Sequence, residues 1–196
     1  MEEVLVVGRA HLEPWLEKRA IITKHSDEIF EVIKENSEFL PREEAERNPE
    51  FKQIIPYVTI VQDQRVFASK RLSRGGEARL HNLVSIGFGG HINPSDSQGD
   101  PLMDGLRREL REEVQIERPG ALRFLGIIND DMNDVGRVHL GLLFTHETEG
   151  NVAVLETEKL EGFWITADEL CDYSEKMEDW SRMAAKVITE GFYGMG

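Results

Sequence analysis

The stretch 105-GLRRELREEV-114 decides how this chain folds. Apolar residues recur there at helical spacing, which predicts a helix whose buried face is formed by Met103, Leu106, Leu110 and Val114. Three acids, Glu109, Glu112 and Glu113, fall on a neighbouring flank. Like charges one turn apart destabilise a helix by about 0.2–0.5 kcal/mol per pair, so this cluster needs a reason.

The residues before this helix offer one. Gly89 and Gly90 end an apolar run, and glycines let backbone carbonyls approach a bound ion closely. Asp100 and Pro101 then form a cap-and-start signal, which predicts a helix running to about Gln115. Three carboxylates and a carbonyl make an all-oxygen site that suits Mg²⁺ or Mn²⁺. The alternative is a solvated helix face, in which Arg108 pairs with Glu112 one turn later.

Composition bounds the protein class. The chain has 196 residues, 40% of them apolar, and a formal net charge of −14. These values predict a globular chain of one domain, or one domain plus an extension, that does not bind nucleic acid or anionic membranes. No apolar run is long enough for a membrane span, and the first residues lack the features of a signal peptide. Cys171 is the single cysteine, which excludes an intrachain disulfide, predicts a packing role and fits a cytoplasmic location.

The order of predicted elements indicates the fold class. Strands are expected at 2–8, 54–72 (two strands around a turn at 62–64), 83–90, 121–130, 137–148 and 161–165. Helices are expected at 25–40 (capped by Ser26), after Asn48-Pro49, at 100–115, at 167–173 (with a Thr166/Glu169 capping box) and at 178–188. The strands cluster without regular strand–helix alternation, which favours an α/β chain of the α+β layered type, with a mixed sheet between helices. We place the boundary between an N-terminal strand–helix extension, 1–52, and the main domain, 53–196.

The box of residues around the charged helix resembles that of the Nudix hydrolases. Their signature is Gly, five residues, Glu, seven residues, Arg-Glu-apolar, any residue, Glu-Glu, any residue, Gly. The core here is Arg108-Glu109-Leu110-Arg111-Glu112-Glu113, and Gly89-Gly90 match the opening glycines. Counting back from Arg108 places Asp100 at the first Glu position, which makes the loop after Gly90 four residues longer than in the family. Gln115 stands where the closing Gly is expected.

The resemblance implies hydrolysis of the pyrophosphate bond in a nucleoside diphosphate linked to another group, with Mg²⁺ or Mn²⁺ as cofactor. Carried over position by position, Glu109, Glu112 and Glu113 would be metal ligands together with the carbonyl of Gly89, and Arg108 would orient the acids. The partner would be a small nucleotide-type molecule, and the family also points to a homodimer. The alternative function is a non-catalytic nucleotide-sensing module, which should have lost one or more of these acids.

The general base is expected in the loop before Trp164, where family members carry a glutamate. Glu158 is our first candidate for the general base and Glu161 is our second. The alternative is that both are solvated loop acids.

Several other residues are candidates for a functional or a structural role. His91 could face phosphates or have no role, and His139 could point into a cleft or into solvent. Turn chemistry accounts best for Asp130 and Asp131. The segment 71–79, with Arg71 and Arg74, could hold an anion, although a plain hairpin loop is slightly preferred.

Overall fold

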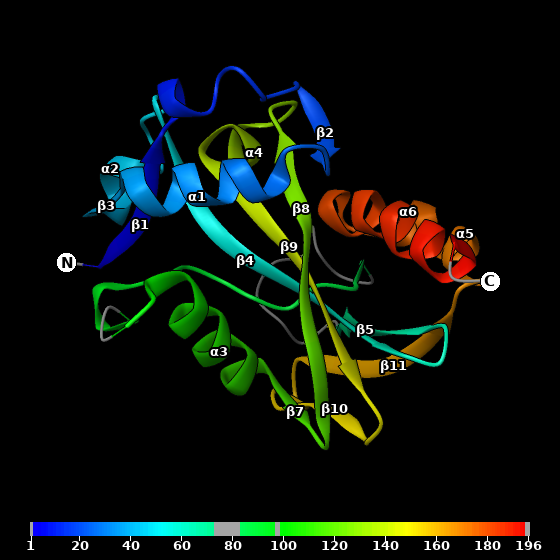
Figure 1. The fold of residues 1–196 in the computed structure, drawn as a ribbon. Helices are drawn as coiled ribbons and strands as arrows, with labels where there is room; N and C mark the ends of the chain where they lie inside the picture. Colours follow the sequence, from blue (N-terminus) through cyan, green and yellow to red (C-terminus); the bar gives the residue numbers. More distant parts are fainter. Residues whose placement is uncertain (1, 73–82, 97–98, 195–196) are drawn as a thin grey trace. The chain divides into compact units, whose positions relative to one another are not determined.

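A computed structural model describes residues 2–72, 83–96 and 99–194 (Figure 1). The chain divides into two units. The first comprises Met1–Tyr57, Gly89–Glu109 and Phe124–Phe144, and the second comprises Val58–Phe88, Leu110–Arg123 and Thr145–Gly196. Within the part of the chain that is described, no helix is both long and apolar enough to cross a membrane.

The elements follow one another in a mixed α and β order. The strands are β1 (Glu3–Gly8), β2 (Arg19–Ile22), β3 (Ser37–Pro41), β4 (Phe51–Gln62), β5 (Arg65–Arg71), β6 (Val84–Ser85), β7 (Val114–Ile116), β8 (Pro119–Asp130), β9 (His139–Thr148), β10 (Val152–Val154) and β11 (Leu160–Thr166). The helices are α1 (Ser26–Asn36), α2 (Arg42–Ala45), α3 (Pro101–Glu113), α4 (Asp134–Val138), α5 (Leu170–Tyr173) and α6 (Asp179–Gly194), with 3₁₀ turns η1 (Arg9–His11), η3 (Pro94–Asp96) and η4 (Ser174–Lys176).

The first unit joins the N-terminal strands to later ones. β1 pairs antiparallel with β3 and with the start of β4, and β2 pairs antiparallel with the end of β8. Figure 1 shows α1 and α2 beside β1 and β3. α1 buries Ile29 and Ile33, and its Phe30 ring lies 4.9 Å from the ring of Phe124. The first 50 residues are therefore paired into the same unit as the box loop; the domain boundary after residue 52 stays a prediction.

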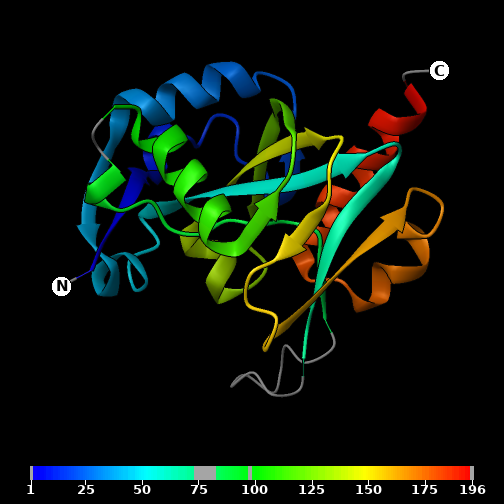
Figure 2. The ribbon, with the colours of Figure 1, turned by 90° about the horizontal axis from the view of Figure 1, so that it is seen from below.

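The second unit is built on the β4–β5 hairpin. Asp63 and Gln64 form its turn with φ of 47° and 60°, the left-handed pair that a two-residue hairpin favours. β11 pairs antiparallel with β5 along its whole length, and the two strands lie beside each other in Figures 1 and 2. Gly162 leaves room for the ring of Phe67, because a Cβ there would lie 2.5 Å from its Cζ. A second, two-stranded ribbon pairs β10 with β7.

α3 matches the predicted helix with small differences. Asp100 caps it, since Oδ1 accepts hydrogen bonds from the N–H groups of Leu102 and Met103 at 3.1 and 3.4 Å. The buried face of the helix contains Leu102, Leu106 and Leu110, and Val114 is buried just after it at the start of β7. Met103 is only half-buried, so the predicted stripe was wrong at its first position. The helix ends at Glu113 because Gln115 pairs with Ala153 in the β7–β10 ribbon.

Other expected elements differ in ways that follow from local contacts. The helix expected at 25–40 stops at Asn36 because β3 pairs with β1, and its N-cap is His25 rather than Ser26. No helix starts at Asn48, whose Oδ1 accepts instead from the N–H of Glu50.

Further along the chain, the turn expected at 131–136 contains the start of α4, capped by Asn133. The strand expected at 83–90 is limited to β6 and an isolated bridge at Phe88. The capping box is confirmed by a 3.0 Å bond from the N–H of Thr166 to Glu169, although α5 begins only at Leu170. The loop expected at 73–82 lies outside the described residues.

Candidate functional site

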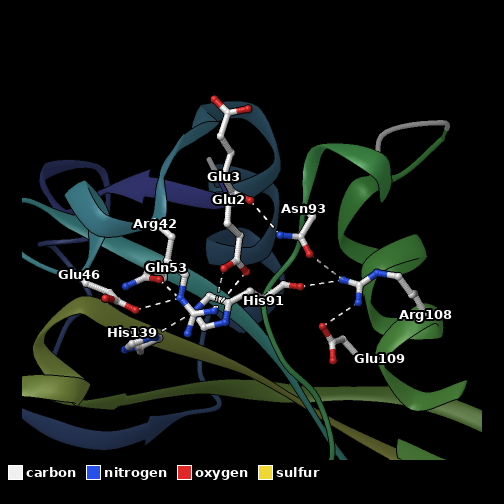
Figure 3. A network of polar contacts seen from close by, with 10 residues as sticks. All are labelled: Glu2, Glu3, Arg42, Glu46, Gln53, His91, Asn93, Arg108, Glu109 and His139. Carbon is white, nitrogen blue, oxygen red and sulfur yellow. Dashed lines mark hydrogen bonds and ion pairs between the residues drawn. The ribbon is translucent and has the colours of Figure 1, made fainter. Parts of the chain in front are cut away.

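Arg108 is the centre of a polar network in the first unit (Figure 3). Its Nε and Nη2 donate to the two carboxylate oxygens of Asp96 at 2.9 and 3.0 Å. Nη1 donates to Oε1 of Glu109 at 2.9 Å. Nη2 also reaches the carbonyl of His91 at 2.8 Å and Oδ1 of Asn93 at 3.3 Å. The guanidinium thus fixes one oxygen of the box glutamate Glu109 to the loop that follows the glycine pair.

The structure assigns the carboxylate partner of Arg108 to Asp96 and not to Asp100. Asp96 follows Gly90 after five residues, which is the spacing of the first Glu in the Nudix signature. The four additional residues therefore lie between Asp96 and Arg108, and Asp100 serves as the helix cap. Counting back from Arg108 gives Asp100, whereas counting forward from Gly90 gives Asp96, and the hydrogen bonds of Arg108 decide between them.

Electrostatics hold this pair in its charged form. Burial alone would raise the pKa of Asp96, but hydrogen bonds from Arg108 and from the N–H of Asn93 outweigh it and lower the pKa. For Arg108, the hydrogen bond to Asp96 raises the pKa further above its already high value. Asp96 is only 6% exposed, so water contributes little to stabilising its charge.

The glycine pair is required by close approaches within this unit. Gly89 has φ of +146°, and a Cβ there would lie 1.9 Å from the carbonyl oxygen of Pro56. A Cβ at Gly90 would lie 2.7 Å from Oε2 of Glu109, so only glycine lets that carboxylate lie against the backbone. Of the three box acids, Glu109 therefore has its carboxylate close to the backbone of the glycine pair.

The remaining box acids belong to the second unit. Glu112 is exposed and Glu113 is half-buried, and the carbonyl of Glu113 accepts from the N–H of Leu155 at 2.9 Å. Within the described ranges, no group of three or more His, Cys, Asp or Glu side chains is arranged to hold a metal ion. The chemistry of the donors still fits Mg²⁺ or Mn²⁺, because carboxylate and carbonyl oxygens on a glycine-opened backbone are their preferred ligands. The ligand set Gly89, Glu109, Glu112 and Glu113 stays a prediction.

His91 and His139 pack against each other. Nδ1 of His139 must donate to the carbonyl of Val135 at 2.7 Å, because a carbonyl only accepts, so its Nε2 is an acceptor in the neutral ring. Nε2 of His91 lies 3.3 Å from that atom and 3.0 Å from Oε1 of Gln53, and its single N–H can donate to either of these two acceptors. Burial, then the charge of Arg42, lowers the pKa of His91 to about 4. His139 therefore points at another side chain, which neither of its two sequence readings anticipated.

A buried charge cluster accounts for Asp131. Its carboxylate pairs with Arg9 and accepts from Nζ of Lys52 at 2.6 Å, while Nζ also donates to the carbonyl of Gly136 at 2.8 Å. Lys52 is fully buried, and Asp131 keeps a pKa of about 2 because the bonds from Arg9 and Lys52 outweigh the effect of burial. Asp131 thus pairs with residues far along the chain, in addition to the turn role predicted from the sequence. Asp130 does have the predicted turn role, because its Oδ1 accepts a hydrogen bond from the N–H of Met132.

The remaining sequence candidates lie in the second unit. Glu158 is exposed in the turn before β11, and Glu161 is exposed on β11 itself. Cys171 is an exposed free thiol on α5, so its expected packing role was wrong. Arg71 ends β5, while its expected partner in anion binding, Arg74, lies outside the described residues.

The glycine pair, Asp96 and the Arg108–Glu109 pair place the chain among proteins with a Nudix box on a mixed α and β fold. The match to the NUDIX domain model, over residues 52–187, shows that the chain belongs to this family. The predicted fold class, a mixed sheet with helices, is confirmed.

Individual relatives support the same assignment. The chain is 41% identical over 170 residues to protein YmaB of Bacillus subtilis (strain 168), a match that covers 82% of each protein. It is 34% identical to Tm1382, a candidate Nudix hydrolase of known structure, with a TM-score of 0.84 over 96% of this chain and 99% of that one. DR0079 from Deinococcus radiodurans, at 13% identity and a TM-score of 0.53 over 76% of this chain and 89% of that one, shares the fold alone. The protein is therefore of the Nudix hydrolase type.

Proposed function

We propose that this protein hydrolyses the pyrophosphate bond of a nucleoside diphosphate linked to another group, with Mg²⁺ or Mn²⁺ as cofactor. The observation that carries the proposal is the box itself. Arg108 binds Glu109 at 2.9 Å, Gly90 leaves space for that carboxylate, and the helix that holds Glu109 also holds Glu112 and Glu113. A module that only senses nucleotides would not need all three acids.

The residues take the following roles in this proposal. The carboxylates of Glu109, Glu112 and Glu113 and the carbonyl of Gly89 would hold the cation, and Arg108 would keep Glu109 oriented. The bound cation would neutralise phosphate oxygens and acidify the attacking water. Glu158, in the turn before β11, would accept the proton of that water, with Glu161 at the start of β11 as the alternative. The strongly negative chain favours a metal-screened anionic substrate, since its net charge of −14 opposes a bare polyanion.

The test is a substrate screen combined with two substitutions that remove a negative charge but keep the size of the side chain. Nucleotide sugars, dinucleoside polyphosphates, coenzymes and nucleoside triphosphates are each assayed with Mg²⁺ and with Mn²⁺. Glu112→Gln and Glu113→Gln should each lower kcat at least about 100-fold, the scale of losing a principal electrostatic group. Glu35→Gln, the same change at an exposed position of α1, is the matched control and should retain full activity.

Two results would count against the proposal. Full turnover in both box variants would remove these acids from the mechanism. Absence of hydrolysis across the screen, with no metal binding by calorimetry, would favour the sensing module instead. The predicted homodimer and the cytoplasmic location stay predictions, to be checked by light scattering and by cell fractionation.

A further inference from the structure

The segment from His91 to Asn93 is tied to other elements of the first unit at every residue. The ring of His91 contacts Gln53 of β4 and His139 of β9. Ile92 is fully buried, and its carbonyl accepts from the N–H of Leu5 in β1 at 2.9 Å. The same segment supplies acceptors to Arg108, so it links the N-terminal strand to the box.

Asn93 carries the link in both directions. Its Nδ2 donates to the carbonyl of Glu3 in β1 at 2.9 Å, and this fixes which end of the amide is the oxygen, because the carbonyl can only accept. The oxygen end then faces Nη2 of Arg108 at 3.3 Å. Figure 3 shows Asn93 between Glu3 and Arg108. The N–H of Asn93 also donates to Oδ2 of Asp96 at 2.9 Å, so this one residue contacts the strand, the arginine and the arginine's carboxylate partner.

The geometry of the guanidinium explains why such a contact matters. The pair with Asp96 uses Nε and Nη2, which leaves Nη1 to hold Glu109. A carboxylate pair restrains the plane of a guanidinium along one edge. The carbonyl of His91 and the amide oxygen of Asn93 add acceptors beside that edge, and they share the two hydrogens of Nη2 with Asp96. Both residues are held by strands: His91 contacts β4 and β9 through its ring, and Asn93 donates to β1.

We propose that Asn93 is a positioning residue, through which strand β1 holds Arg108 in the orientation that presents Glu109. The inference rests on the proposed function for its catalytic consequence, but the link from Asn93 to Arg108 does not depend on it. This link means that the N-terminal strand β1 contributes to the site and is not a separate extension.

The first measurement needs neither metal nor substrate. Hydrogen exchange of the Arg108 Nε–H and Nη–H groups is followed by ¹⁵N NMR in the full chain, and Asn93→Ala should accelerate it about 10-fold or more. Asn151→Ala is the matched control, since Asn151 also donates from Nδ2, to Glu117 at 3.1 Å, but in the second unit. Its exchange at Arg108 should equal that of the wild type. Asn93→Ser, which shortens the side chain and removes the amide, serves if Asn93→Ala fails to fold, and it should also accelerate the exchange.

The second measurement concerns the site. Asn93→Ala should weaken Mn²⁺ binding, measured by electron paramagnetic resonance, about 5-fold to 10-fold. It should also lower kcat about 10-fold with KM changed less than about 2-fold. In an Arg108→Lys background the same substitution should have little further effect on either quantity, because it acts through the lost guanidinium. Additive effects would mean a general structural role and would overturn the inference.

The two proposals fail in different ways. If the wild type neither binds Mn²⁺ nor hydrolyses any compound of the screen, the proposed function falls, while the exchange rates still decide whether Asn93 holds Arg108. If the wild type is active and Asn93→Ala matches it in exchange, Mn²⁺ affinity and kcat, the inference falls and the function stands.

Discussion

The substitution Asp96→Asn tests which acid pairs with Arg108. Asparagine keeps the shape of the side chain but loses the negative charge and one acceptor oxygen. Asp96 accepts from Nε and Nη2 of Arg108 at 2.9 and 3.0 Å and from the N–H of Asn93 at 2.9 Å. All three hydrogen bonds are made to the carboxylate of Asp96, and this side chain is almost completely buried.

The expected loss of stability follows from burial. Removing one partner of a buried ion pair costs about 3–5 kcal/mol. The Arg108 side chain is 27% exposed, so water can compensate part of that loss, and we expect about 2–3 kcal/mol. For a domain of this size, that lowers Tm by about 4–12 °C. Because the folded pKa of Asp96 is lowered, the stabilisation is present above the unfolded carboxyl pKa of about 3.9 and is lost as pH falls through the folded pKa.

Urea denaturation at neutral pH and at pH 3 measures these quantities, with Asp100→Asn as the matched control. Asparagine caps a helix as well as aspartate does, so Asp100→Asn should change the free energy of unfolding by less than about 0.5 kcal/mol. The difference between wild type and Asp96→Asn should shrink at pH 3. A larger loss in Asp100→Asn than in Asp96→Asn would refute the assignment of Asp96 as the arginine's partner.

Further predictions concern the glycine pair and the buried charge cluster. Gly90→Ala should lower kcat about 10-fold by displacing Glu109. It should change the free energy of unfolding by less than about 1 kcal/mol, because the carboxylate can move aside. Gly191→Ala is the control and should keep full activity, because there is open space around Gly191. Asp131→Asn should lower the free energy of unfolding in urea by about 3 kcal/mol, because it leaves the fully buried Lys52 without its carboxylate. The folded pKa of Asp131 is about 2, so its stabilisation is present above about pH 4 and is lost toward pH 2; a wild-type to Asp131→Asn difference that stays constant over that range would contradict this origin.

Much of the fold was predictable because its signals are local. Asp100-Pro101 predicted the start of α3, and the hydrogen bonds of Asp100 confirm it. The hairpin around Asp63 and the Thr166–Glu169 capping bond were likewise predicted from residues three or fewer positions apart. Such features depend on backbone geometry within one turn. The equally local signals at Ser26 and Asn48-Pro49 failed, so a local signal does not by itself guarantee the element.

The strands β2, β7 and β10 were missed because each is only three or four residues long. Their partners lie far along the chain, as for β2 with β8 and β7 with β10. A short run without a strong alternation acquires its extended form from the neighbour that pairs with it, and that neighbour is chosen by tertiary packing.

The sequence by itself determined the family and the helix that carries the three box acids, because these follow from residue types at fixed spacings along one element. Only the tertiary structure decided that Asp96 and not Asp100 binds Arg108, and that Asn93 joins the box to β1. It alone paired Arg9 and Lys52 with Asp131, 122 and 79 residues away. The physical reason is that a charged or polar side chain takes the partner that burial leaves within reach, and the folded backbone sets that reach.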